Sequence, residues 1–99
     1  MAHEAADFDA TLAAAAGEDA ALLQELRAAF VESLVQQVDL LRRSRCDGNW
    51  KVAATRLRDL GASFHAPELV RLGEQALQGA PGEPGVLRRL ERFSAEFTA

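Results

Sequence analysis

Cysteine is almost absent from this chain of 99 residues, and the single one, Cys46, cannot form an intramolecular disulfide. A lone cysteine fits a reducing compartment. The two histidines, His3 and His65, have no Cys, Asp or Glu neighbours at the spacing of metal ligands, so we expect no metal site and no cofactor. Glycine-rich phosphate loops, nucleophile elbows and paired catalytic carboxylates are also missing from the sequence.

Long apolar runs are missing as well. No segment approaches the ~20 apolar residues needed to span a bilayer, and the acidic start, MAHEAADFD, does not resemble a secretory signal peptide. We therefore expect a cytoplasmic protein without membrane segments. The chain also has no excess of positive charge, because its net charge is −4 and its isoelectric point is about 5.1. This balance disfavours nucleic acids and anionic membranes as partners.

Tyrosine is absent and β-branched residues are few, whereas alanine and leucine are abundant. This composition favours helices over strands. The length allows one domain, residues 1–99, with a single modest core. Within it, we expect residues 1–7, which are small and charged, to be disordered.

Apolar spacing and turn formers divide the remaining chain into five predicted helices. They run from Asp7 or Asp9, as the N-cap, to Ala16, from 18 to 45, from 49 to 64, from 67 to 77, and from about 86 to the end. Each carries one apolar stripe, and four amphipathic helices bury such stripes best against one another. The expected fold is therefore an all-α antiparallel four-helix bundle, with the short N-terminal helix across one end.

The segment from Trp50 to Leu69 has two distinct faces. Its apolar residues recur in steps of three and four, at Trp50, Ala53, Leu57, Leu60 and Phe64. The opposite face is available to water or to a partner, and it carries Lys51, Thr55, Arg56, Arg58, Asp59 and Ala62.

This segment resembles the signature region of histidine-containing phosphotransfer domains, the modules of bacterial phosphorelays, whose pattern is approximately A-H-x-L-K-G-S-x-x-x-x-G-A-x-x-L. Ala54, Leu57, Ala66 and Leu69 match this pattern. Nearer the N-terminus, Phe8-Asp9 followed by Leu12 is similar to the family's F-D-x-x-x-L, with one residue fewer before the leucine. The resemblance extends over nearly the whole chain and implies the family's four-helix bundle.

The chain departs from the family at its functional positions. Thr55 replaces the phosphoacceptor histidine, Arg58 replaces a lysine, and Asp59 and His65 each replace a glycine. In the family, the histidine takes a phosphoryl group from the aspartyl phosphate of a receiver domain. A threonine hydroxyl needs a base to act as a nucleophile, and no histidine lies one helical turn from Thr55. The resemblance therefore implies a member without a phosphoacceptor, so we expect no catalytic residue.

Two of these replacements leave alternatives open. Asp59 is expected either to repel the carboxylate-rich phosphorylation pocket of a receiver or to pair with Lys51, Arg56 or Arg58. His65 follows Thr55 by ten residues and points elsewhere on an ideal helix. It lies at a junction where glycine would allow a positive φ, so packing or capping is the expected role, with phosphate relay through His65 as the alternative.

The leading functional hypothesis is a monomeric docking module of a two-component pathway. It would bind a response-regulator receiver domain or a histidine kinase through Lys51, Thr55, Arg56, Arg58, Asp59 and Ala62, without transferring phosphate. An active phosphotransfer protein that uses His65 is the second hypothesis. The third is a helical adaptor that binds an unrelated protein partner.

Overall fold

The computed structural model describes the backbone of residues 3–98 and the side chains of residues 5–98, and within this range the chain forms helices and no strand. The helices are α1 (His3–Ala16), α2 (Ala20–Arg43), α3 (Asp47–Ser63), α4 (Pro67–Gln78) and α5 (Pro84–Thr98). The all-α class expected from the composition is confirmed. None of these helices combines the length and the apolar character needed to cross a bilayer.

The predicted boundaries differ most from the observed ones at the N-terminus. Disorder was expected for residues 1–7, but α1 begins at His3, so neither Asp7 nor Asp9 occupies its N-cap. Alanine has the highest helix propensity, and Ala5 is buried, so this segment gains from being helical. Residues 1 and 2 lie outside the described part of the chain. The boundary of α2 follows the prediction more closely, because Asp19 accepts a hydrogen bond from the Leu22 N–H at 2.9 Å.

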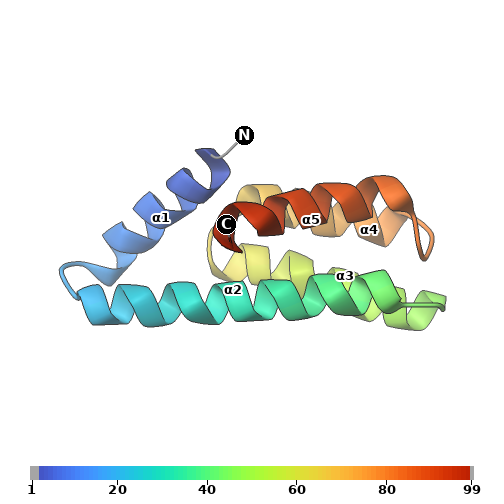
Figure 1. Cartoon of the computed structure of the whole chain (residues 1–99), viewed down its shortest axis with the longest axis horizontal. Coiled ribbons are helices and arrows are strands. Elements are labelled where there is room, and N and C mark those ends of the chain that lie inside the picture. Colours follow the sequence, from blue (N-terminus) through green and yellow to red (C-terminus); the bar gives the residue numbers. More distant parts are fainter. Residues whose placement is uncertain (1–2, 99) are drawn as a thin grey trace.

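Helices α2 to α5 pack around a common core. Helix α2 contacts α3 and α5, and α4 contacts the same two helices, so each of the four has neighbours on two sides. Helix α1 contacts α2 and α5, and it diverges from α2 at one end of the molecule (Figure 1). The result is an elongated helical bundle with extents of 44 × 24 × 19 Å.

The core contains large apolar side chains from the four bundle helices. Phe30, Leu34, Leu41, Trp50, Leu57, Leu69, Val86 and Leu90 are at most 1% exposed. At the end that carries α1, Phe8 joins an aromatic cluster, with its ring centroid 4.2 Å from that of Phe30 and 5.2 Å from that of Phe97. Nearer the other end, the Trp50 Nε1–H donates a buried hydrogen bond of 2.6 Å to the Ala76 carbonyl oxygen.

Two glycines allow α3 and α4 to approach closely. A Cβ atom added at Gly61 of α3 would lie 2.8 Å from the Val70 backbone nitrogen. One added at Gly73 of α4 would lie 2.7 Å from the Arg58 backbone nitrogen. Real Cβ atoms do not approach other atoms this closely, so both positions need a residue without a side chain. This contact sets how α3 lies on the bundle and therefore which of its residues face outward.

Helix α5 begins two residues before the predicted start, at Pro84, and Glu83 caps it. The Glu83 carboxylate accepts hydrogen bonds from the backbone N–H groups of Gly85 and Val86, at 2.8 and 2.9 Å. These hydrogen bonds, Val86 first, lower the pKa of Glu83 below its ordinary value. Proline at the first helical position forgoes no intrahelical hydrogen bond, which makes this start favourable.

Candidate docking face on helix α3

Helix α3 lies on the bundle with its apolar face inward, as its spacing predicts. Trp50, Ala53 and Leu57 are buried, and Leu60 and Phe64 are partly buried and pack against the core. The six residues of the opposite face are exposed or half-exposed, and we call them the α3 outer face: Lys51, Thr55, Arg56, Arg58, Asp59 and Ala62. The structure therefore brings these predicted binding residues together on one accessible surface.

Thr55 lies at the centre of the α3 outer face and is half-exposed. Its neighbours one turn away are Lys51 and Asp59, both exposed. No imidazole stands beside it, and no hydrogen bond joins its hydroxyl to another side chain in the described part of the chain. A threonine hydroxyl in this setting has no base to activate it, so the geometry does not support phosphoryl transfer through Thr55.

Asp59 pairs with Arg58, one of the two outcomes expected from the sequence. Its Oδ1 accepts hydrogen bonds from Arg58 Nε and Nη2, at 3.3 and 3.2 Å. An exposed ion pair of this kind contributes at most about 1 kcal/mol. The pair does, however, offset the negative charge of Asp59. Lys51 and Arg56, the other two cations of the α3 outer face, form no ion pair with any described residue.

His65 has a structural role at the end of α3, as the sequence suggested. Its φ of 55° lies in the left-handed region, which is otherwise occupied only by glycines among the described residues. The His65 N–H donates to the Ala62 carbonyl oxygen at 3.4 Å, and the Ala66 N–H donates to that of Gly61 at 2.7 Å. This pair of bonds is a Schellman motif, with His65 in the position where glycine is usual.

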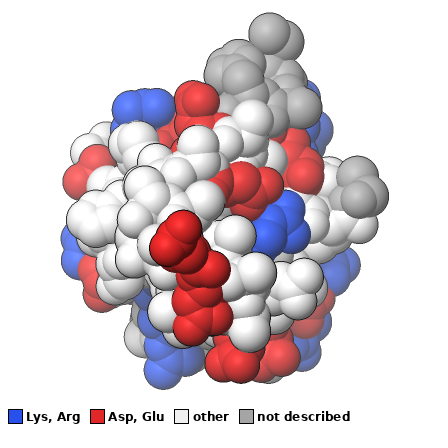
Figure 2. Space-filling model, turned by 90° about the vertical axis from the view of Figure 1, so that its left-hand side faces the viewer, with Lys and Arg blue, Asp and Glu red and all other residues white. Residues whose placement is uncertain are grey.

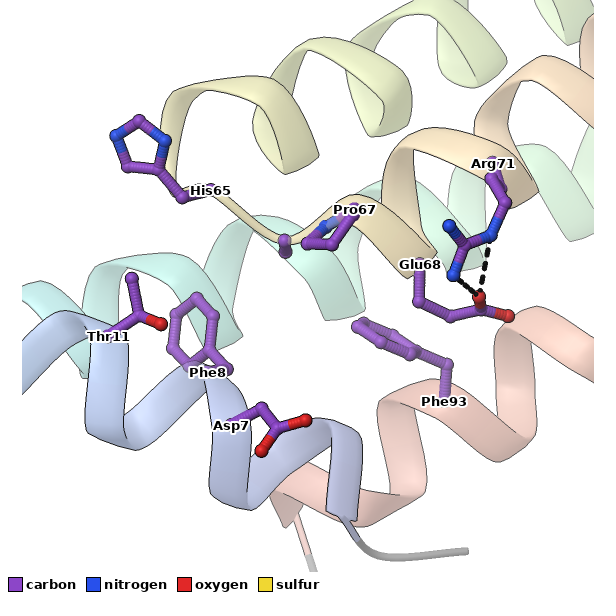
Figure 3. Close-up of a pocket in the computed structure, with 9 residues that line it drawn as sticks. Asp7, Phe8, Thr11, His65, Pro67, Glu68, Arg71 and Phe93 are labelled. Atoms are coloured by element: carbon purple, nitrogen blue, oxygen red, sulfur yellow. Dashed lines mark hydrogen bonds and ion pairs between the residues drawn. The ribbon is translucent and has the colours of Figure 1, made fainter.

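The structure separates His65 from Thr55. Ten residues of helical chain correspond to about 15 Å, and His65 lies beyond the C-terminus of α3, in the turn before α4. Its imidazole is exposed and points away from the other labelled side chains in Figure 3. His65 is therefore not part of the α3 outer face. The other histidine, His3, has a side chain that lies outside the described part of the chain.

A groove between α2 and α3 adds residues that the sequence reasoning missed. It has a volume of about 330 Å³ and is lined by apolar, amide and basic side chains, among them Leu40, Val52, Gln37, Asn49, Arg43 and Arg56. Leu40 and Val52 are 39% and 50% exposed, which is unusual for such side chains. Both lie outside the apolar stripe that faces the core on their helix. An apolar residue outside the stripe is the feature of the sequence that could have indicated this groove.

Metal binding and thiol chemistry receive no support from the arrangement of side chains. Within the described residues, no group of three or more His, Cys, Asp or Glu side chains is placed to hold a metal ion. Cys46 is free and exposed at the start of α3. The chemistry available on the α3 outer face and in the adjoining groove is therefore charge and apolar contact, which are the means of protein recognition.

Comparison with models of known protein families, with curated proteins and with solved structures found no match in any of the three.

Proposed function

We propose that this protein is a docking module of the histidine-containing phosphotransfer type that does not accept phosphate. One observation carries the proposal: the positions that match the family pattern are buried, and the position of the acceptor is accessible. Ala54, Leu57 and Leu69 are fully buried, whereas Thr55 is half-exposed on α3. The scaffold that presents the acceptor in the resembling family is retained here without the imidazole that performs the reaction.

The helix contacts support the finer architecture of this proposal. The two-sided contacts of α2 to α5 suit an antiparallel four-helix bundle, in which α3 presents its outer face on one side. The positive φ at His65 suits a turn built for glycine, the residue of the resembling family at this position. The tight packing of Gly73 on Arg58 gives the outer face a rigid support.

The surface chemistry favours a receiver domain or a histidine kinase as the partner. The phosphorylation pocket of a receiver is rich in carboxylates. Arg56 provides positive charge beside Leu40 and Val52 in the groove, and Lys51 provides it on the adjoining α3 outer face, whereas Arg43 is paired with Asp39. Opposite charges steer the encounter, and the apolar pair supplies area that becomes buried. Because Arg58 pairs with Asp59, that carboxylate repels an acidic partner less than a free one would.

In this role the protein would act by occupancy. A copy docked on a receiver covers the phosphorylated aspartate without removing its phosphoryl group, and thereby excludes an active phosphotransfer domain. No covalent step is involved, so the outcome depends only on affinity and concentration.

Calorimetric titration with receiver domains and kinase domains from the same organism tests this proposal. We expect binding to at least one of them, and Arg56→Glu should weaken it about tenfold, because a cation that faces acidic groups becomes an anion. Arg92→Glu, an exposed change on α5, is the matched control and should leave the affinity unchanged. If no domain binds, or if both variants bind like the unmodified chain, the docking proposal is wrong.

A helical adaptor for an unrelated partner is the second candidate. The observation that favours it is the set of exposed large apolar side chains Leu22, Val35, Leu40 and Val52, which are distributed over α2 and α3 and not confined to the α3 outer face. Cross-linking in cell extract, followed by mass spectrometry, would distinguish the two. Partners without a receiver or kinase domain, captured by a photoreactive diazirine residue introduced in place of Val35 or Leu22, would favour the adaptor.

A further inference from the structure

A second cavity, larger than the α2–α3 groove, lies at the end of the molecule that carries α1. It has a volume of about 610 Å³ and is enclosed by α1, the turn between α3 and α4, α4 itself and α5 (Figure 3). Ligand pockets in proteins usually measure about 300–1,000 Å³. We call it the α1 cleft. None of its lining residues belongs to the α3 outer face.

The floor of the α1 cleft is apolar and tightly packed. Phe8 from α1 and Phe93 from α5 line it and are 4% and 5% exposed, and Pro67 lines it at the start of α4. The Phe8 ring packs 4.2 Å from Phe30, and the Phe93 ring packs 5.1 Å from Phe97, measured between centroids. These contacts hold the rings before any ligand arrives, so little conformational entropy is lost when a flat apolar group enters.

The rim of the α1 cleft is negatively charged. Asp7 and Glu68 contribute carboxylates from α1 and α4, and Figure 3 draws Phe93 between them. Arg71 is the one basic side chain of the lining, counting histidine as neutral, and it is engaged with Glu68 through hydrogen bonds, one of them 3.0 Å from Nε to Oε1. The guanidinium is thus committed to one carboxylate, and the sum of charges at the rim is −1.

The surface around this end of the molecule adds to that negative potential. Glu18 and Asp19 are exposed at the turn between α1 and α2. In the end-on view of Figure 2, carboxylates gather near the centre, with a basic side chain beside them and further Lys and Arg towards the edge. An excess of carboxylates raises the local concentration of cationic ligands.

We infer that the α1 cleft binds a small organic cation with a flat apolar body, such as an aromatic amine. The apolar body lies over the cleft lining formed by Phe8, Pro67 and Phe93, and the ammonium group lies at the rim beside Asp7 and Glu68. An organic anion of the same shape is disfavoured, because two carboxylates repel it and Arg71 must leave Glu68 to receive it. This inference uses no residue of the proposed docking function.

The test uses the full chain and three matched probes: 2-phenylethylamine, neutral 2-phenylethanol and anionic phenylacetate. Titration is followed by amide chemical shifts in two-dimensional NMR. We expect the amine to bind saturably about fivefold more tightly than the alcohol, with shifts confined to α1, the α3–α4 turn, the first turns of α4, and α5. Asp7→Asn should weaken amine binding about two- to fivefold, and Asp47→Asn, an exposed change at the opposite end of α3, should not.

Each other result overturns the inference. Binding of the amine with shifts located elsewhere, or binding that does not saturate, removes the site. Equal affinity for amine and alcohol, or no effect of Asp7→Asn in a chain with unchanged circular dichroism, removes the role of charge. Tighter binding of phenylacetate shows that Arg71, and not the carboxylates, selects the ligand.

Discussion

At the level of single residues, Thr55 and Asp59 lie one helical turn apart on the α3 outer face, at positions where the resembling family has histidine and glycine. The difference in chemistry is large and local. A neutral imidazole is a nucleophile near neutral pH, whereas a hydroxyl requires a base, and the carboxylate of Asp59 is engaged with Arg58. Thr55 is half-exposed and Asp59 is exposed, so neither side chain is part of the buried core.

We therefore expect the double variant Thr55→His, Asp59→Gly to become a phosphoacceptor. The imidazole supplies the nucleophile, and glycine removes the carboxylate beside it. Incubation with a phosphorylated receiver should transfer acid-labile label to the variant, while the single change Asp59→Gly, which keeps the hydroxyl, should take up none. A well-folded double variant that stays unlabelled with every receiver would contradict this expectation.

At the scale of helices, the α3–α4 contact depends on Gly73. A Cβ at this position would lie 2.7–2.8 Å from the backbone nitrogen, Cα and Cβ of Arg58, and a helix backbone cannot move aside without disturbing its own hydrogen bonds. We expect Gly73→Ala to reduce the free energy of unfolding by about 1–3 kcal/mol, measured by urea denaturation.

Gly48→Ala is the matched control for that variant. Gly48 lies in the first turn of α3, where an added Cβ would meet nothing within 4 Å. Alanine is also the better helix former, so the change should be neutral or stabilising by up to about 1 kcal/mol. Equal effects of the two substitutions would show that the close approach of α3 and α4 is not what requires glycine.

The start of α5 has a pH dependence that follows from Glu83. Because hydrogen bonds from Val86 and Gly85 lower its pKa in the folded state, the ionised side chain stabilises the fold above the unfolded-state pKa. This contribution is lost as the pH falls through the lowered folded-state pKa. We expect Glu83→Gln to be less stable than the unmodified chain at pH 7, and the difference to shrink when unfolding is measured near pH 3.

Glu25→Gln provides the comparison for Glu83. Glu25 is exposed on α2, and its carboxylate accepts no backbone hydrogen bond within the described structure. The gap between Glu25→Gln and the unmodified chain should therefore change less with pH than the gap for Glu83→Gln. A gap for Glu83 that stays constant from pH 7 to pH 3 would contradict its role as an ionised cap.

At the scale of the whole molecule, Phe8 connects α1 to the bundle. Its ring lies within 4.2–6.3 Å of the Phe30, Phe64 and Phe97 rings, measured between centroids, and these come from α2, the end of α3 and α5. An ion pair of 2.8 Å between Asp9 and Arg27 adds a second link to α2. The pair is about half-exposed and therefore contributes less than the buried ring.

We expect Phe8→Ala to lower the free energy of unfolding by about 3–5 kcal/mol, because a buried ring leaves a cavity that helices cannot close completely. A chain of this size has a total stability of about 5–15 kcal/mol, so the melting temperature should fall markedly in calorimetry. Leu22→Ala, which changes a side chain that is 41% exposed, should cost much less. A small effect of Phe8→Ala would mean that α1 adds little to the core.

The sequence by itself determined the helices, the turns and the two faces of α3, because helical periodicity and turn propensity act over a few residues. It also placed His65 at a junction where glycine would allow a positive φ, and His65 has a φ of 55° there. Disorder was the wrong prediction for residues 3–7, which are helical. The prediction followed their charge and their place near the N-terminus, and it gave too little weight to the helix propensity of alanine.

Only the tertiary structure decided how these elements meet. It selected Arg58 among three possible partners of Asp59 and brought Leu40 and Val52 into one groove. It also formed the α1 cleft from side chains as far apart in the chain as Asp7 and Phe93. It also revealed why Gly73 matters, through its contact with the Arg58 backbone. Such contacts join residues far apart in the chain, and they depend on how helices cross, which the spacing within one helix does not specify.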